Sequence, residues 1–132
     1  MLTKSPSGSL CPYYYMGGEL HPLKYGSYHL DREGLFCVMK AEEEFILRSS
    51  GMRNRRIWVD LYETELDDEV CEMLSYHILA IRDKIFKLCF VGCSFGDIRR
   101  LLKHMRERVP DQAGQARFFS DPEDAKKWLV GE

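Results

Sequence analysis

The stretch that decides the fold of this chain is Arg56-Ile57-Trp58-Val59-Asp60-Leu61-Tyr62. Its centre is a short, nearly unbroken apolar run, which is typical of a β-strand covered on both faces. The following residues carry apolar side chains at helical spacing, so we expect the chain to turn at the strand's carboxyl end and return as a helix. In open sheets with such crossovers, ligand and partner sites gather at that end.

Similar strand–helix units are predicted downstream. Strands are expected at residues 87–92 and 116–119. Helices are expected at three sets of apolar residues: Leu66, Val70, Met73, Leu74, Ile78 and Ile81; Ile98, Leu101, Leu102, Met105 and Val109; and Ala125, Trp128 and Leu129. The second helix should stop at Pro110, before a loop that contains Gly114. Thr64 or Asp67 should cap the first.

The upstream residues predict a hairpin, a short helix and an arm. Residues 27–30 and 35–39 flank a polar loop that ends in glycine, as in a β-hairpin. Residues 41–48 are expected to be helical. Residues 1–24 contain Ser, Gly and Pro punctuation and predict an arm with little secondary structure. The adjacent tyrosines 13–15 either pack on the domain or on a second subunit, giving a homodimer, or belong to a mobile tail.

The order of these elements predicts an α/β fold. We expect one domain over residues 25–132, preceded by the arm at 1–24. Alternating strands and helices imply a mixed, mainly parallel sheet with right-handed crossovers, and the hairpin adds an N-terminal antiparallel pair.

Composition narrows the class of protein. The chain has 132 residues, 45% of them hydrophobic and 30% charged, as in ordinary globular domains. A net charge of −2 argues against a nucleic-acid binder. No apolar run is long enough for a membrane span, and the first residues lack a secretory signal, so a cytoplasmic protein is expected. Five cysteines without C-x-x-C pairs and four scattered histidines predict free thiols, no metal site and no cofactor.

The most suggestive chemistry lies where the strand at 87–92 meets its helix. Residues 93–99 have the C-x-x-G-x-x-R spacing of a phosphatase loop, with Cys93 as nucleophile and Arg99 as the phosphate clamp. Amides at a helix N-terminus suit an anion and lower the pKa of a nearby thiol. Asp97, however, places a negative charge inside the supposed phosphate cradle. The possible ligand or anion corner comprises Gly92, Cys93, Ser94, Gly96 and Arg99.

Two other interpretations of this corner remain open. Gly92, Ser94 and Gly96 also fit the G-x-S-x-G motif of hydrolases, but His104 is the only later histidine and lies on the next helix. The simplest interpretation is structural, because Ser94 and Asp97 have the spacing of a capping box.

The two strand–helix corners carry opposite charges. The first contains only acidic charged residues, namely Asp60, Glu63, Glu65, Asp67, Asp68, Glu69 and Glu72. The helix after the second corner is rich in cations: Arg99, Arg100, Lys103, His104, Arg106 and Arg108. Adjacent parallel units would place these fields close together, where they either neutralise one another or orient a charged protein partner.

From about Tyr28 to Leu129 the chain resembles the STAS superfamily, particularly its SpoIIAA-like branch related to bacterial anti-sigma-factor antagonists. Three stretches carry the resemblance: 57–61, an apolar strand ending in Asp-Leu; 88–92 with the helix residues 99–102; and 117–125 with Trp128 and Leu129. The resemblance implies a mixed sheet with helices mostly on one face, and a role in binding another protein.

The resemblance also implies a phosphorylation site that this chain lacks. Switchable members carry a phosphorylatable serine at the start of the helix after the organising strand, and here that position is Glu69 or Val70. Phosphorylation would add about two charges, and Glu69 supplies roughly half of that permanently. Either the chain is fixed in one state, or its role is unrelated to kinase switching.

The leading hypothesis is therefore a non-enzymatic regulatory domain that binds a protein partner through its acidic corner. The residues expected to make that contact are Asp60, Asp68, Glu69, Met73 and Tyr76. The alternatives are a module that binds a lipid or an anionic small molecule, and a phosphatase that uses Cys93 and Arg99.

Overall fold

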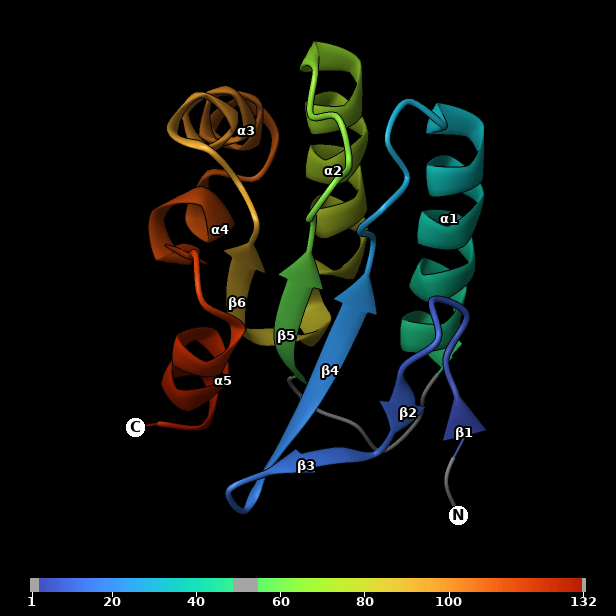
Figure 1. Cartoon of the computed structure of the whole chain (residues 1–132), viewed down its shortest axis with the longest axis vertical. Helices are drawn as coiled ribbons and strands as arrows, with labels where there is room; N and C mark the ends of the chain where they lie inside the picture. Colours follow the sequence, from blue (N-terminus) through green and yellow to red (C-terminus); the bar gives the residue numbers. More distant parts are fainter. Residues whose placement is uncertain (1–2, 49–54, 132) are drawn as a thin grey trace.

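The structure is a computed structural model that describes residues 3–48 and 55–131. Figure 1 shows the elements, which follow in this order: β1 (Thr3–Lys4), β2 (Leu10–Cys11), β3 (Tyr13–Tyr15), β4 (Gly18–Lys24), α1 (Arg32–Arg48), β5 (Arg55–Asp60), α2 (Asp68–Ile81), the 3₁₀-helix η1 (Arg82–Lys84), β6 (Ile85–Val91), α3 (Phe95–Arg108), α4 (Pro110–Gln115), β7 (Arg117–Phe119) and α5 (Pro122–Val130). Within the described residues, no helix is long and apolar enough to cross a membrane.

The main sheet is mixed and mostly parallel, as the sequence predicts. Its strand order is β3-β4-β5-β6-β7, with only β3 antiparallel, and β1 and β2 form a separate antiparallel pair. The organising strand β5 lies at the centre, where Val59 pairs with Leu23 on one side and Phe90 on the other. Flanked by strands on both sides and covered on both faces, β5 carries apolar side chains at its three consecutive positions Ile57, Trp58 and Val59.

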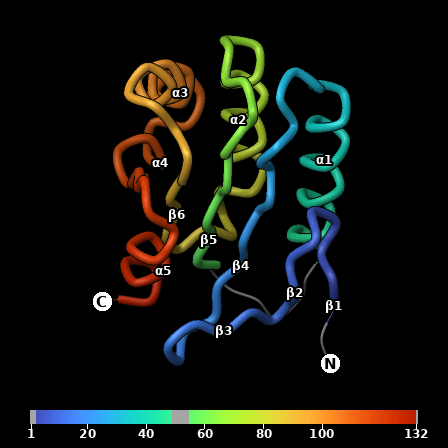
Figure 2. Tube along the Cα trace, in the orientation of Figure 1, coloured from blue at the N-terminus to red at the C-terminus, as the bar shows by residue number. Residues whose placement is uncertain are grey.

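Helices cover the two faces of the sheet unequally. Figure 2 shows the chain winding through β4, α1, β5, α2, β6 and α3, so that α1, α2 and α3 lie in sequence along the sheet. Alternate strand residues such as Ile57 and Val59 join the core beneath these helices, whereas Trp58 points to the other face, which α5 covers with Ala125 and Leu129. The alternation follows from the two-residue period of a strand.

The predicted hairpin at 27–39 is wrong, because α1 occupies most of it. Leu35, Met39, Glu42 and Ile46 form the buried stripe of that helix at helical spacing. Gly34 does not close a β-turn. It lies in the first helical turn of α1, where its backbone N–H donates to Asp31 Oδ1 at 2.9 Å. The apolar run 35–39 misled because a short apolar run fits a strand and a buried helix equally well.

The expectation of an arm with little secondary structure at 1–24 is also wrong. These residues form four strands, and β4 pairs in parallel with β5 inside the main sheet. The sequence predicts one antiparallel pair near the N-terminus, at residues 27–39; the structure instead has two such pairs at earlier residues, β1–β2 and β3–β4. Tyr13 and Tyr15 pack against the core beneath α5 of the same chain, while Tyr14 remains exposed.

The downstream elements agree more closely with the sequence. Asp67 is the N-cap of α2, and its carboxylate accepts a hydrogen bond from Val70 N at 2.9 Å. Ser94 and Asp97 form the predicted capping box of α3. One correction applies here: residues 110–115 form the short helix α4, with Pro110 in its first turn, rather than a loop.

A buried carboxylate joins the N-terminal strands to α1. Glu42 is 0% exposed. It accepts hydrogen bonds from Ser5 Oγ at 2.7 Å, Ser7 N at 2.8 Å and His21 Nε2 at 3.1 Å, and another from Ser7 Oγ. Arg55 approaches the other ring nitrogen of His21 at 2.6 Å. A guanidinium can only donate and a carboxylate can only accept, so a neutral imidazole transmits the interaction between these two buried charges.

The serines of this region also protect the edge of β4. Ser9 Oγ donates to Pro22 O, and Lys24 N donates to Ser7 Oγ at 3.1 Å. Pro22 lacks a backbone N–H, but its carbonyl group bonds Ser9, and the parallel pairing of β4 with β5 continues through it. Side-chain hydroxyls thus replace a neighbouring strand along this part of the sheet.

We predict that Glu42→Gln lowers the free energy of unfolding by about 3 kcal/mol, because it leaves buried donors and Arg55 without their anion. Burial alone raises the pKa of Glu42, but the hydrogen bonds from His21, Ser7 and Ser5 outweigh it and place the pKa below its ordinary value of 4.5. The stabilisation is therefore complete above the unfolded pKa and is lost as the pH falls through the folded pKa. Urea unfolding at a series of pH values measures both effects.

The matched control is Glu44→Gln, two residues further along the same helix, where the glutamate side chain is 70% exposed. It should change the unfolding free energy by less than about 0.5 kcal/mol. Equal stabilities of the two variants would contradict a structural role for Glu42.

Candidate functional site

A groove of about 350 Å³ lies between α1 and α2. The side chains that line it are Phe36, Met39, Lys40 and Glu43 from α1, and Glu69, Glu72, Met73, Tyr76 and His77 from α2. Its walls are aromatic and thioether groups, and its rim carries carboxylates. Apolar pockets with a few convergent polar groups are the usual form of a binding site.

Helical periodicity brings these residues to one groove. On α2 they recur at intervals of three and four, and on α1 they do the same. The two helices follow consecutive parallel strands, β4 and β5, so they pack side by side on one face of the sheet. Met39 is buried at the floor, whereas Phe36 and Tyr76 are exposed at the edges.

A chain of three hydrogen-bonded side chains runs from buried Tyr25 through buried His77 to the partly exposed Glu43 in the groove. His77 Nδ1 lies 3.1 Å from Glu43 Oε1, and His77 Nε2 lies 2.7 Å from the hydroxyl of Tyr25. A neutral imidazole satisfies both contacts, since Nδ1–H donates to the carboxylate and Nε2 accepts from the phenol. Burial, with Glu42 and Glu43 nearby, raises the pKa of Tyr25 well above its ordinary value. His77 is thus a buried histidine whose two ring nitrogens both have partners within the chain.

The other two carboxylates of the groove have partners outside it. Arg32 Nε lies 3.2 Å from Glu69 Oε1, and Arg32 also bonds Asp67. Arg108 of α3 reaches Glu72 Oε2 at 2.5 Å. The rim therefore consists of ion pairs in contact with water, which are screened by salt and contribute little stability individually.

The structure brings together only part of the predicted contact surface. Glu69, Met73 and Tyr76 line the groove. Asp68 lies on the side of α2 that faces α3, where its carboxylate is 3.0 Å from His104 Nε2. Asp60 ends β5 and accepts a hydrogen bond from Tyr62 N at 3.0 Å, apart from the groove.

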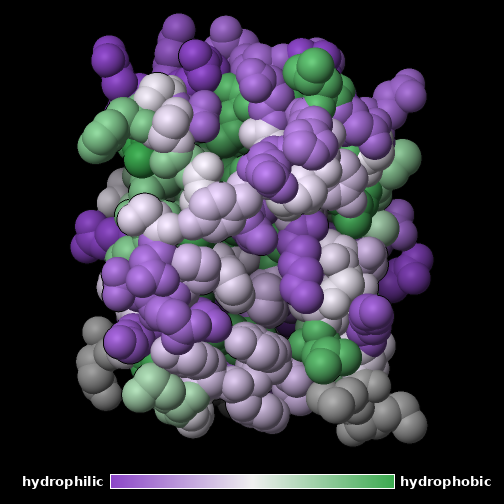
Figure 3. Space-filling view, in the orientation of Figure 1, coloured by the Kyte–Doolittle hydropathy of each residue, from purple (hydrophilic) through white to green (hydrophobic). Residues whose placement is uncertain are grey.

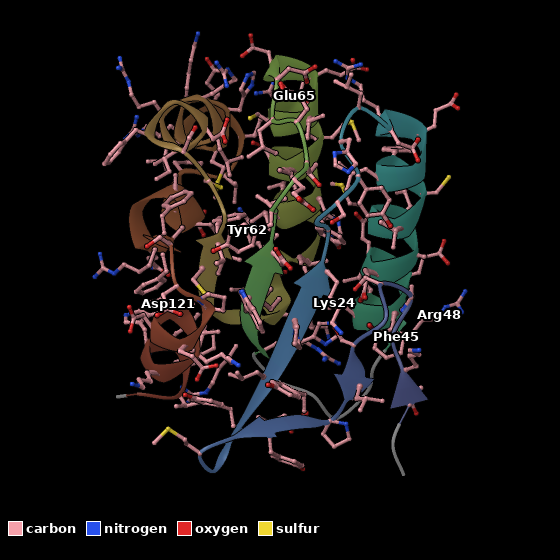
Figure 4. The ribbon with its side chains drawn as sticks, in the orientation of Figure 1. Lys24, Phe45, Arg48, Tyr62, Glu65 and Asp121 are labelled. Atoms are coloured by element: carbon pink, nitrogen blue, oxygen red, sulfur yellow. The ribbon has the colours of Figure 1, made fainter. Side chains whose placement is uncertain are left out.

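Acidic and basic fields meet along α2 and α3, as the sequence predicts. His104 on Asp68 and Arg108 on Glu72 join the two helices, and Arg100 Nη1 donates to Leu66 O at 2.9 Å. Figure 4 shows Glu65 near the upper end of α2 and Tyr62 close to the carboxyl end of β5. In Figure 3 the upper end of the molecule is mostly hydrophilic, with few hydrophobic residues between the polar ones.

The second corner does not assemble a nucleophile. Cys93 packs against the core, and burial, with Asp97 and Cys71 nearby, raises the pKa of its thiol to about 12. A phosphatase nucleophile needs the opposite shift. Ser94 is engaged in the capping box of α3, which satisfies the simplest interpretation of this corner. Gly92 has a φ of +93° and lies against Tyr62, where a side chain would clash with its backbone.

Gly96 and Arg99 belong to a surface depression whose lining does not include Cys93. Together with Arg100 and Lys103 they line this shallow depression on the outside of α3. The structure therefore separates the residues that the phosphatase interpretation joins, with the thiol partly buried against the core and the cations in the depression on α3. All five cysteines of the chain are free, and within residues 3–48 and 55–131 no group of His, Cys, Asp and Glu is arranged to hold a metal ion.

Sequence reasoning missed the half of the groove that α1 contributes. Phe36, Met39, Lys40 and Glu43 fall partly in the segment predicted as a hairpin. Their spacing of three, four and seven residues is a helical signal that could have identified them together. The pairing of Glu43 with His77 joins residues 34 positions apart and has no local signal.

Comparison with family models, with curated proteins and with solved structures found no match to the chain. The chemistry of the groove and of the two corners therefore rests on their own residues.

We predict that Cys93 reacts slowly with iodoacetamide at neutral pH, because its thiol is partly buried against the core and burial raises its pKa to about 12. Cys37 is exposed on α1 and serves as the internal reference. Peptide mapping by mass spectrometry should show Cys37 modified first and Cys93 only under denaturing conditions. Comparable rates at the two sites would indicate that Cys93 is an accessible thiolate.

Proposed function

We propose that the chain is a regulatory domain of the STAS type that binds a protein partner through the groove between α1 and α2. The observation that carries the proposal is the joint presentation of Glu69, Met73 and Tyr76 by one face of α2. The sequence predicts that these three residues contact a partner, and α1 supplies the opposite wall of their groove. Asp68 does not line the groove; its carboxylate pairs with His104 and so connects α2 to α3 beside it.

The composition of the groove supports a protein ligand. Exposed aromatic residues and methionines are enriched where proteins meet, because they supply contact area and adapt to the shape of a partner. Tyr76 is 54% exposed and Phe36 is 46% exposed, so both offer apolar surface that the domain itself leaves in water. A groove between two helices is the form that receives an amphipathic helix.

The position of Glu69 also supports the STAS proposal. The resemblance assigns the phosphorylatable serine of switchable relatives to Glu69 or Val70. Val70 is buried, whereas the Glu69 side chain is 67% exposed at the first turn of α2. Glu69 thus presents one permanent negative charge at the rim of the groove, and we infer a domain held in one state rather than switched by a kinase.

A second candidate function is the binding of a small molecule in the same groove. Its volume of about 350 Å³ falls at the lower end of the range for ligand pockets. Three glutamates on the lining favour a neutral or cationic ligand over the anionic one expected from the sequence. A rise in Tm with such a ligand that disappears in Tyr76→Ala would support this alternative.

We predict that Glu69→Lys and Tyr76→Ala each weaken binding of the partner at least about tenfold, since one reverses a rim charge and the other removes an aromatic contact. Immobilised wild-type and variant domains are incubated with the same cell extract, and recovered proteins are quantified by mass spectrometry. Candidates retained by the wild type and lost from both variants are then purified for measurement of Kd.

The matched control is Asp83→Lys, which reverses a charge on η1 at a side chain that is 94% exposed. It should recover the same proteins as the wild type. Recovery that is equal for the wild type, both groove variants and this control would rule out the groove as the partner surface.

A further inference from the structure

Glu43 has one carboxylate oxygen held by the protein core and a second that faces a cation. Oε1 accepts from His77 Nδ1, and Tyr25 in turn fixes His77 from beneath. Tyr25 is 0% exposed and His77 is 3% exposed, so packing on all sides restricts this support. The hydrogen bond from His77 also holds the pKa of Glu43 below its ordinary value and keeps the carboxylate charged.

Lys40 is the cation that the second oxygen meets. Its Nζ lies 3.7 Å from Glu43 Oε2 and 5.5 Å from the centroid of the Phe36 ring. The nitrogen–oxygen distance exceeds that of a normal hydrogen bond, and the Lys40 side chain is 56% exposed. Contacts of this kind on an exposed helix stabilise it only slightly, so the ammonium group is held loosely.

We propose that this carboxylate and aromatic ring form a binding site for a lysine ammonium group, which Lys40 occupies in the free chain and a lysine of the partner takes over on binding. The proposal rests on the proposed function and specifies the partner as an amphipathic helix with lysine beside its apolar stripe. Within the groove, Phe36, Met39, Met73 and Tyr76 receive the apolar stripe.

The charge of the groove favours a basic partner. Three carboxylates line it, Glu43, Glu69 and Glu72, and the last two belong to the stretch 60–72, which contains seven carboxylates and no basic residue. Basic side chains from α1 and α3 neutralise only some of these acids, with Arg32 pairing with Asp67 and Arg108 with Glu72. Once a helix covers the groove and excludes water, the ion pair on Glu43 strengthens because the local dielectric falls.

The experiment uses a fluorescently labelled synthetic helix of leucine and lysine, with Kd measured from fluorescence anisotropy. Lys40→Met should bind this helix about threefold more tightly than the wild type, because it removes an internal competitor. Arg48→Met is the matched control: it removes one positive charge from the same helix, at an exposed side chain that pairs with Glu44 at i,i+4. Its Kd should remain near that of the wild type.

Glu43→Gln completes a double-mutant cycle. It should weaken binding about fivefold, and in that background Lys40→Met should no longer improve affinity, since the site for which Lys40 competes is gone. The comparison of Lys40→Met with Arg48→Met remains decisive if Glu43→Gln fails to fold. Acetylation of the lysines of the synthetic helix should abolish the gain from Lys40→Met.

The outcomes separate this inference from the proposed function. Equal gains in Lys40→Met and Arg48→Met, or a gain that persists with Glu43→Gln, would overturn the lysine site and leave only a general charge effect. If Glu69→Lys and Tyr76→Ala weaken binding while Lys40→Met has no effect, the groove stands and the lysine site does not. If none of the groove variants changes Kd, the proposed function fails as well.

Discussion

The rotation of α1 about its own axis is the constraint on which the groove depends. Glu42 and Glu43 are consecutive, so their side chains leave the helix about 100° apart. Glu42 is held by Ser5, Ser7 and His21 at the amino-terminal strands, and Glu43 is held by His77 on α2. Two carboxylates thus hold α1 from two directions, and neither can move without losing a buried partner.

This arrangement links the N-terminal residues to the groove through α1. Ser5 and Ser7 donate to Glu42, and Ser7 and Ser9 bond the backbone of β4. β4 in turn pairs with β5. An ionised carboxylate in the interior is stable only while its donors remain in place. The N-terminal strands are therefore part of the support of α1, rather than an appendage to the domain.

The sequence predicts what depends on local periodicity and fails where distant residues decide. β5, α2, β6 and α3 follow from apolar spacing and from capping residues such as Asp67 and Ser94. β4 contains His21 and Pro22, which disguise an interior strand, and their places are set by Arg55, Glu42 and Ser9 far along the chain. The groove shares this division, since α2 supplies its predictable half and α1 the half that was missed.

The paired rim of the groove has a consequence for how affinity and specificity are divided. Glu43, Glu69 and Glu72 each have a cation nearby in the free chain: Lys40, Arg32 and Arg108. A basic partner therefore exchanges one ion pair for another instead of gaining a new one, and the net Coulombic energy of binding is small. Burial of Phe36, Met73 and Tyr76 must then supply most of the affinity. The carboxylates instead select the partner's charge. An acidic side chain placed among them would be repelled, because Lys40, Arg32 and Arg108 already pair with these three carboxylates.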